Sequence, residues 1–533
     1  MTKVDGQALA AKAIAARDAT IPKEYLLPKS AYPLPKNRRG LLESSGIMKP
    51  RELEIVDLTM IPLAKAIADK KYTAVEVATA YCKAAAIAQQ ATNCVLELFQ
   101  DEALAEAKKL DDYLEKNGKT VGPLHGVPIS IKDHIRQKGH AAPCGFLYAV
   151  DQIAEEDSHL FKILREAGAV PYVRTINCQA VMHLECRSAW GETLNPWNVD
   201  LVPGGSTGGE GALIAMRASP MGVGSDIGGS VRSPAAACGI FSFKPSIGRV
   251  PNSGAETLSA AAGYEGIIST LGPMGRSVED LELIMRIIAD AKPWEYDPVL
   301  QVKPWREVKR TGKLRVGVLR DDGVVKPVGS ITRALDYAVD KLKKNGNFEI
   351  VEYKPYESEK SWDIITKLYF PDGGKLVYDS LKKAGEPADP MTDWIVGQGR
   401  ELDRDEIINL VAERDRYRKA VAAHWQKAGI DCLISPVGPT PAPQPFTAKY
   451  WNYTSYWNLA NYPAGVFPTG LFVDKNDTKD DYKPRNEQEK EVYETYDPVK
   501  AEGAPLCLQV VGYIGHEEDT LDAMKQIVDA VTK

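Results

Sequence analysis

PGGSTGGEGALIAMRASPMGVGSDIGGSVRSP, residues 203–234, contains two Gly-Gly-Ser turns that present Ser206 and Ser230. Glycine at this density lets the backbone adopt positive φ and approach a ligand closely, with N–H groups pointing inward. A nucleophilic hydroxyl and an anion-stabilising pocket need this kind of backbone. Serine also needs a base, and Lys132 in GPLHGVPISIKDH, residues 122–134, is a candidate.

Short apolar segments alternate with helical ones on both sides of this stretch. Strands are expected at residues 127–132, 170–173, 314–319, 350–353, 432–435 and 508–512. Helices are expected at residues 7–17, near 158–166, from 211, at 332–344 and at about 517–531. The alternation predicts an α/β fold: a single large domain with a central mixed, largely parallel twisted sheet covered by helices.

Local signals define two further helices. Thr73 and Glu76 form a capping-box pattern that opens an alanine-rich helix to about Gln90. The next helix has an apolar stripe and ends at Asn117-Gly118; the stripe consists of Ala103, Ala107, Leu110 and Leu114.

Composition restricts the class of protein. The chain has 533 residues, 44% hydrophobic content, 26% charged content and a net charge of -6, typical of an ordinary globular protein. The net charge argues against a nucleic-acid ligand, and no window reaches the roughly 20 apolar residues of a membrane helix. None of the eight cysteines forms a C-x-x-C pair and no signal peptide is seen, so a cytoplasmic location is expected.

We divide the chain into an N-terminal extension, 1–55, which wraps as an arm, and a main domain, 56–533. The charged stretch 474–502 has almost no aliphatic residue, which predicts a solvated surface insertion.

Two readings of the serines remain open at this point. Residues 204–208 fit G-x-S-x-G, the nucleophile elbow of α/β-hydrolases, with Ser206 as the nucleophile of an esterase. Only His424 and His516 follow Ser206, and neither has a marked context. Alternatively, an uncharged lysine serves as general base toward serine, provided that desolvation lowers its pKa. Lys132 follows a five-residue apolar run and suits this role.

Four motifs in fixed order resemble the amidase signature family of serine hydrolases, over most of the chain from about residue 60. They are GPLHGVPISIKD (122–133), TLNPWN (193–198), PGGSTGGEGALIA (203–215) and GVGSDIGGSVRSPAAACGIFSFKPS (222–246). The spacing between Ser206 and Ser230 also fits the family. Glu210 and the MHLE segment at 182–185 resemble its fungal acetamidase and fatty-acid-amide-hydrolase branch.

The resemblance implies the amidase signature fold and a Lys132, Ser206, Ser230 triad. Ser230 would be the nucleophile and Ser206, preceded by Gly205 through a cis peptide, the proton relay. The oxyanion hole would consist of the backbone N–H groups of Ile227, Gly228, Gly229 and Ser230. The implied enzyme hydrolyses linear amides through an acyl-serine intermediate, with no cofactor and no metal.

Further candidates surround this set. Met182, Thr207 and Gly205 are expected to bind substrate. Two interpretations remain open for six apolar and aromatic residues: they line an acyl pocket, or they pack in the core. These residues are Met182, Leu184, Trp451, Tyr453, Tyr456 and Trp457. Asp226 and Arg232 are predicted to pair structurally across the turn, and His125 and His134 to be satisfied structural histidines. The expected partner is a small-molecule amide, with a homodimer as an option, and an amidotransferase subunit is a further alternative.

Overall fold

In the computed structural model, an 11-stranded sheet organises the described residues, which are 5–255, 257–258, 263–479 and 481–533. The strands are β1 Val95–Leu98, β2 Pro128–Lys132, β3 Val170–Thr175, β6 Met221–Asp226, β7 Phe241–Lys244, β8 Thr270–Gly275, β9 Leu314–Val318, β10 Phe348–Glu352, β11 Cys432–Pro436, β12 Ala464–Phe472 and β13 Pro505–Gly512. A separate two-stranded sheet joins β4 Arg187–Ser188 and β5 Gly191–Glu192.

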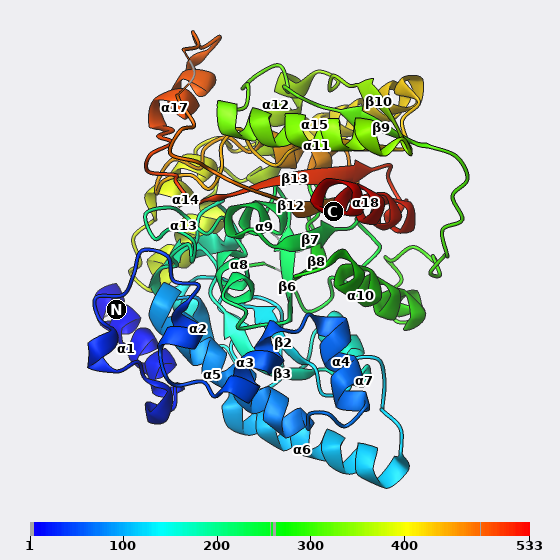
Figure 1. Cartoon of the computed structure of the whole chain (residues 1–533). Coiled ribbons are helices and arrows are strands. Elements are labelled where there is room, and N and C mark those ends of the chain that lie inside the picture. Colours follow the sequence, from blue (N-terminus) through cyan, green and yellow to red (C-terminus); the bar gives the residue numbers. More distant parts are fainter. Residues whose placement is uncertain (1–4, 256, 259–262, 480) are drawn as a thin grey trace.

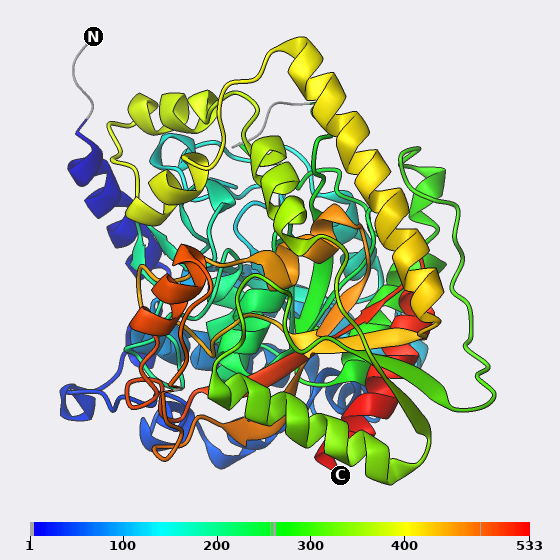
Figure 2. The same ribbon diagram turned by 90° about the horizontal axis from the view of Figure 1, so that it is seen from above.

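Helices surround this sheet (Figures 1 and 2). They are α1 Gly6–Ala19, α2 Leu41–Ser44, α3 Pro50–Asp57, α4 Met60–Ala68, α5 Ala74–Thr92, α6 Gln100–Asn117, α7 His159–Glu166, α8 Gly208–Ala215, α9 Arg232–Cys238, α10 Val278–Asp290, α11 Gly329–Asn345, α12 Ser358–Tyr369, α13 Lys375–Lys383, α14 Pro390–Val396, α15 Arg404–Ala428, α16 Asn452–Leu459, α17 Glu487–Thr495 and α18 Glu517–Thr532.

The sheet is mixed, as predicted, but its centre is antiparallel. The strand order is β1-β3-β2-β6-β8-β7-β12-β13-β11-β9-β10. Parallel pairs join β3, β2 and β6 near one end, and β11, β9 and β10 at the other. Every neighbouring pair from β6 to β11 is antiparallel. The expectation of a largely parallel sheet is therefore corrected. The strands β7, β8 and β12 were not predicted, because β7 has only four residues and Gly and Pro interrupt β8 and β12.

Helices cover both faces of the sheet, and the alternating side chains of β12 show which helix lies on which face. In β12, Gly465 meets Met524 of α18, whereas Val466 packs in a cluster with residues of α8 and α9. Successive strand residues point to opposite faces, so α18 lies on one face and α9 on the other. Helices α8 and α9 carry the two Gly-Gly-Ser turns at their N-terminal ends.

The helix signals of the sequence are confirmed. The side chains of Thr73 and Glu76 form the capping box of α5, and α6 buries the four residues of the predicted stripe. Gly118 ends α6 in the left-handed conformation with φ +65°, which glycine adopts without steric cost.

Residues 5–55 lie along the main body and bury apolar side chains in its core, among them Tyr25, Leu41 and Leu42. Residues 1–4 fall outside the described part of the chain. In the stretch 474–502, of which residue 480 is likewise not described, most charged side chains are exposed. Val492, Tyr493 and Tyr496 are buried in a core cluster, so α17 is packed and this part of the predicted solvated insertion is corrected.

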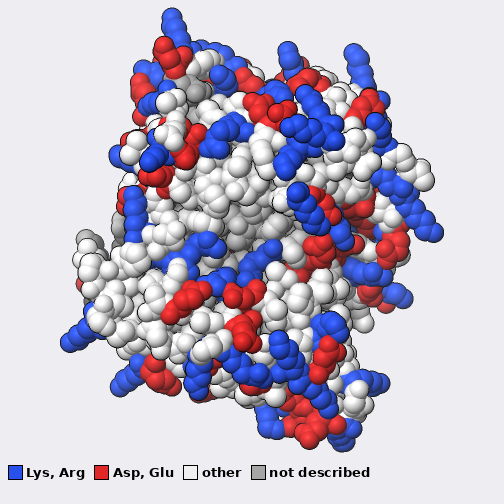
Figure 3. Space-filling view, viewed as in Figure 1, with Lys and Arg blue, Asp and Glu red and all other residues white. Residues whose placement is uncertain are grey.

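The surface carries no single dominant sign of charge on the face seen in Figure 3, where basic and acidic residues intermingle around an uncharged hollow. All eight cysteines are buried and free, as expected. Among the described helices, none combines the length and the apolarity needed to cross a membrane.

Candidate active site

Two parallel strand ends form the base of the site. Lys132 is the last residue of β2 and Asp226 the last of β6, and these strands pair in parallel. The carboxyl ends of neighbouring parallel strands meet at one edge of a sheet, where ligands commonly bind. In β2, Ile129 and Ile131 enter the main core, so alternation directs Ser130 and Lys132 to the face covered by α8.

Lys132 is fully buried and lies between hydroxyl groups. Its Nζ is 2.6 Å from Ser206 Oγ and 3.0 Å from Ser225 Oγ. Burial lowers the pKa of Lys132 from 10.5 to about 8, because desolvation disfavours the ammonium form. The side chain is therefore partly neutral near neutral pH and can accept a proton, as the sequence required of a lysine base.

The two serines border one cavity. Ser206 and Ser230 both line it, together with Ser225 and Met182. The Gly205–Ser206 peptide bond is cis, as the resemblance implied. The geometry thus brings the three predicted reactive side chains together.

The loop between β6 and α9 is fastened by a buried ion pair. Arg232 Nε and Nη2 each lie 3.0 Å from a carboxylate oxygen of Asp226, and both side chains are inaccessible to solvent. The predicted structural pairing is confirmed. The guanidinium of Arg232 counteracts the desolvation that would raise the pKa of Asp226 and leaves that pKa far below its usual value.

The same carboxylate changes the predicted oxyanion hole. The N–H of Gly229 donates to Asp226 Oδ1 at 2.8 Å, so it is already engaged. In the described part of the chain, the N–H groups of Ile227, Gly228 and Ser230 have no hydrogen-bond acceptor. One of the four predicted donors, the Gly229 N–H, is therefore already hydrogen-bonded in this structure, and the other three N–H groups are free to donate.

The cavity wall contains residues that the sequence did not single out. They come from four separate segments and are Val181, Thr257, Ser269, Tyr369 and Phe370. Tyr369 is the last residue of α12 and Phe370 follows it. Both lie far along the chain from the two serines, and no periodicity or motif marks them. Only proximity in the fold identifies them.

Among the predicted substrate-binding residues, Met182 lines the cavity but Gly205 and Thr207 do not. A Cβ at Gly205 would lie 2.2 Å from the carbonyl oxygen of Glu185, so this glycine serves a close backbone approach. Thr207 is fully buried and packs against Gly224.

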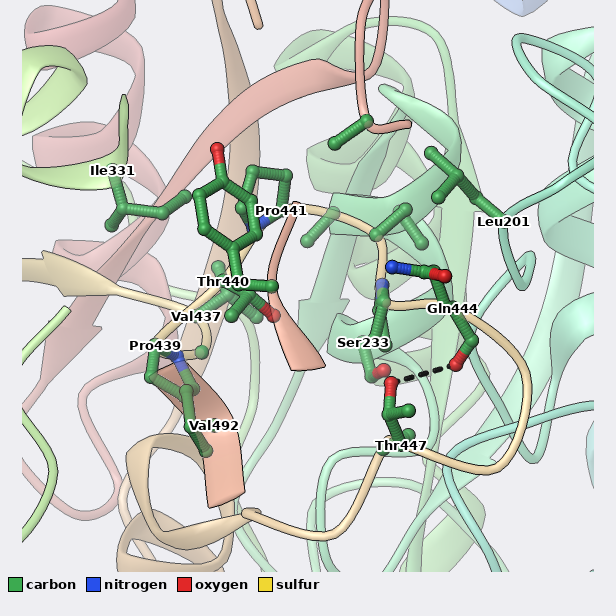
Figure 4. Close-up of a pocket in the computed structure, with 18 of the residues that line it drawn as sticks. Leu201, Ser233, Ile331, Val437, Pro439, Thr440, Pro441, Gln444, Thr447 and Val492 are labelled. Atoms are coloured by element: carbon green, nitrogen blue, oxygen red, sulfur yellow. Dashed lines mark hydrogen bonds between the residues drawn. The ribbon is translucent and has the colours of Figure 1, made fainter. Parts of the chain in front are cut away.

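For the aromatic residues that the sequence left open between a pocket wall and core packing, the structure supports core packing. Trp451, Tyr453, Tyr456 and Trp457 are buried in one aromatic-rich cluster, outside the lining of the serine cavity. Leu184 lines a different cavity, formed by the proline-bearing loop 437–444 and by α9 (Figure 4). Ser233 of α9 also lines this second cavity, which shares no lining residue with the first.

The histidines do not serve Ser206. His424 is 2.7 Å from the Lys354 carbonyl and His516 pairs with Asp519, so neither lines the cavity. The esterase alternative lacks its base.

The two histidines around Lys132, His125 and His134, are buried. Contrary to the prediction, their ring nitrogens do not all have hydrogen-bond partners among the described residues. His125 Nδ1 accepts a hydrogen bond from Val121, whereas its Nε2 has no partner among the described residues. Neither ring nitrogen of His134 has one within the described chain. Burial, with Lys132 and Arg174 nearby, holds the pKa of His134 well below its usual range.

Glu210 lies beneath the lysine. It is fully buried and accepts hydrogen bonds from Ser130 and Thr175 at 2.5 and 2.9 Å. Burial raises the pKa of Glu210 to about 8, so much of it is neutral at pH 7. Because a protonated Glu210 carries no negative charge, it does not raise the pKa of Lys132. In the described chain, no cluster of three or more His, Cys, Asp or Glu could hold a metal ion.

Comparison with known proteins agrees with this geometry. The profile of the Amidase family matches residues 76–521. The chain belongs to the amidase family. A Schizosaccharomyces pombe protein is 46% identical to this amidase, and the match covers 98% of this chain and 99% of the S. pombe protein. An acetamidase of Emericella nidulans is 36% identical, covering 95% of each chain.

A solved structure shares the whole fold of this amidase. A fatty acid amide hydrolase superposes with a TM-score of 0.94 at 36% identity, covering 99% of this chain and 95% of the other. The predicted family and α/β fold are confirmed, and the protein is an enzyme that hydrolyses amide bonds.

Proposed function

We propose that this amidase hydrolyses linear carboxylic amides to an acid and ammonia or an amine, with Ser230 as nucleophile. The observation that carries this proposal is the contact of a buried, pKa-lowered Lys132 with Ser206, which borders the same cavity as Ser230. A lysine base with a relaying serine needs no imidazole.

The reaction divides into two halves. Ser230 Oγ attacks the amide carbonyl carbon and gives its proton to Ser206, whose own proton passes to Lys132 Nζ. The proton then returns through Ser206 to the amide nitrogen as the C–N bond breaks. Water hydrolyses the acyl-Ser230 ester to regenerate the enzyme. The N–H groups of Ile227, Gly228 and Ser230 stabilise the negative carbonyl oxygen.

A graded panel from acetamide to long-chain and aryl amides tests the activity, with ammonia or amine release as the readout. Ser230→Ala should abolish release, while Ser233→Ala, whose hydroxyl borders the second cavity, should retain it. Ammonia release by the purified chain alone also separates a free amidase from an amidotransferase subunit.

Covalent trapping tests the identity of the nucleophile. A slowly deacylating activated ester should add its acyl mass to the peptide that contains Ser230. An acyl group on Ser206, or full activity of Ser230→Ala, contradicts the proposal. Loss of activity in His516→Ala would favour the esterase alternative instead.

A further inference from the structure

We propose that Tyr369 is a positioning residue that aims the N–H of Gly228 at the oxyanion. This inference rests on the proposed function, because it assumes attack by Ser230 beside the loop 226–230. Tyr369 lines the serine cavity, and its hydroxyl donates to the Ile227 carbonyl oxygen at 2.9 Å.

The peptide group that Tyr369 holds is fixed only at its oxygen. In a trans peptide, C=O and N–H point in opposite directions, and the Ile227–Gly228 bond is not among the cis bonds. A Tyr369 hydroxyl on the Ile227 oxygen therefore turns the Gly228 N–H away from itself. That N–H has no acceptor among the described residues.

The next peptide group is held at both ends. Thr454 Oγ1 donates to the Gly228 carbonyl at 2.7 Å, and the Gly229 N–H donates to Asp226 at 2.8 Å. This peptide cannot rotate without breaking two hydrogen bonds. The Ile227–Gly228 peptide has one restraint, so its free donor depends on the tyrosine hydroxyl.

The surroundings of Tyr369 keep that hydroxyl a donor. Burial, with the carboxylate of Asp226 nearby, raises its pKa well above 10, so it stays protonated over the working pH range. The hydroxyl lies 2.7 Å from where a Cβ on Gly228 would be, so a side chain at position 228 would collide with it. The position of the Tyr369 hydroxyl therefore requires a glycine at residue 228.

The test is Tyr369→Phe, which keeps the ring that lines the cavity and removes only the hydroxyl. Loss of one oxyanion donor costs about 10²–10³ in kcat, so loss of its positioning should lower kcat about tenfold to a hundredfold. KM should stay within about threefold. Tyr462→Phe is the matched control, since Tyr462 is buried and its hydroxyl has no partner in the described chain.

A transition-state analogue separates positioning from general structure. A trifluoromethyl ketone that forms a tetrahedral Ser230 adduct should bind Tyr369→Phe more weakly by the same factor as kcat/KM falls. The corresponding alcohol, which forms no oxyanion, should bind both proteins equally. If Tyr369→Phe does not fold, Tyr369→Leu also lacks the hydroxyl and receives the same measurements.

The outcomes are distinct. A variant with kcat and ketone affinity within twofold of the parent overturns the role of Tyr369 while Ser230→Ala remains inactive. An equal loss of affinity for ketone and alcohol also overturns it, because that indicates general damage. Failure of the proposed function would show instead as turnover by Ser230→Ala and no ketone adduct on Ser230.

Discussion

At the residue scale, the chemistry depends on how much water each side chain retains. Lys132 has no access to solvent, and its closest polar neighbours are two serine hydroxyls rather than carboxylates. Lys132 has no ion-pair partner among the described residues, so its ammonium form loses hydration that the hydroxyls only partly replace. The neutral amine is correspondingly favoured, and this is the form that a general base needs.

The first prediction is a basic limb in the pH profile. Lys132 must be neutral to act as base, and its pKa is lowered to about 8. We expect kcat/KM to rise with pH through a midpoint near 8 and then to level off, measured from pH 6 to 10.

Lys244 is the control for this assignment, because burial lowers its pKa to about 7 as well. Lys244→Met should leave the midpoint in place. A profile that stays flat where chemistry limits the rate, or a midpoint that moves with Lys244→Met, contradicts the role of Lys132.

The second prediction concerns stability. A pKa that falls from 10.5 in the unfolded chain to about 8 in the fold costs up to about 3 kcal/mol below pH 8. Lys132→Met should remove this cost, raising the free energy of unfolding by about 3 kcal/mol at pH 7 and by about 1 kcal/mol at pH 10. The gain fades as pH rises because the unfolded lysine also becomes neutral.

Urea unfolding at both pH values measures this difference, and Lys343→Met, at an exposed position of α11, is the reference. A gain in Lys132→Met that does not change with pH, or no gain at all, would show that the buried amine carries no such cost.

At the element scale, helix ends and strand ends determine where the functional groups lie. Helices α8 and α9 each begin directly after a Gly-Gly-Ser turn, and β2 and β6 end side by side. The lysine, the serines and the loop 226–230 are therefore all held at termini of regular elements. Helix α5 packs against both α8 and β2 and so helps to hold these two elements in place.

The third prediction tests the start of α5. Thr73→Ala removes the hydroxyl that accepts the Glu76 N–H at 3.0 Å and should lower the free energy of unfolding by about 1 kcal/mol. Thr79→Ala is the matched control, because the Thr79 hydroxyl bonds only to a carbonyl of the preceding turn. Equal losses in the two variants, measured by urea unfolding, would show that the capping box contributes nothing specific.

At the scale of the whole molecule, the core excludes all eight thiols from solvent. Burial raises the pKa of each of them, which further suppresses the reactive thiolate; for Cys186, the value is about 11. The cysteines thus act as small apolar side chains.

The fourth prediction follows from this burial. A thiol reagent at pH 7.5 should label none of the eight cysteines in the native enzyme within minutes, and all of them in guanidinium chloride. Mass spectrometry counts the labels. Rapid labelling of a native cysteine would show that its part of the core opens readily.

The sequence by itself determined the family, the α/β class and the capped helices, because these depend on local spacing and on long motifs in fixed order. The same motifs predict Lys132, Ser206 and Ser230 as the reactive side chains. It could not predict the central antiparallel strands β7, β8 and β12, because their pairing partners lie elsewhere in the chain and their own patterns are weak. Trp451 and its aromatic neighbours left two interpretations open, because composition does not distinguish a pocket wall from a core.

Only the tertiary structure decided which groups surround the serines. It brought Tyr369 to the Ile227 carbonyl, engaged the Gly229 N–H with Asp226, and kept His424 and His516 away from the cavity. Each of these outcomes depends on contacts between residues distant in sequence, or on a hydrogen bond whose direction the backbone conformation sets. Long-range contacts and hydrogen-bond directions produce no periodic pattern in the sequence. The residue types therefore indicate the kind of chemistry, whereas the packing determines which groups lie close enough to take part in it.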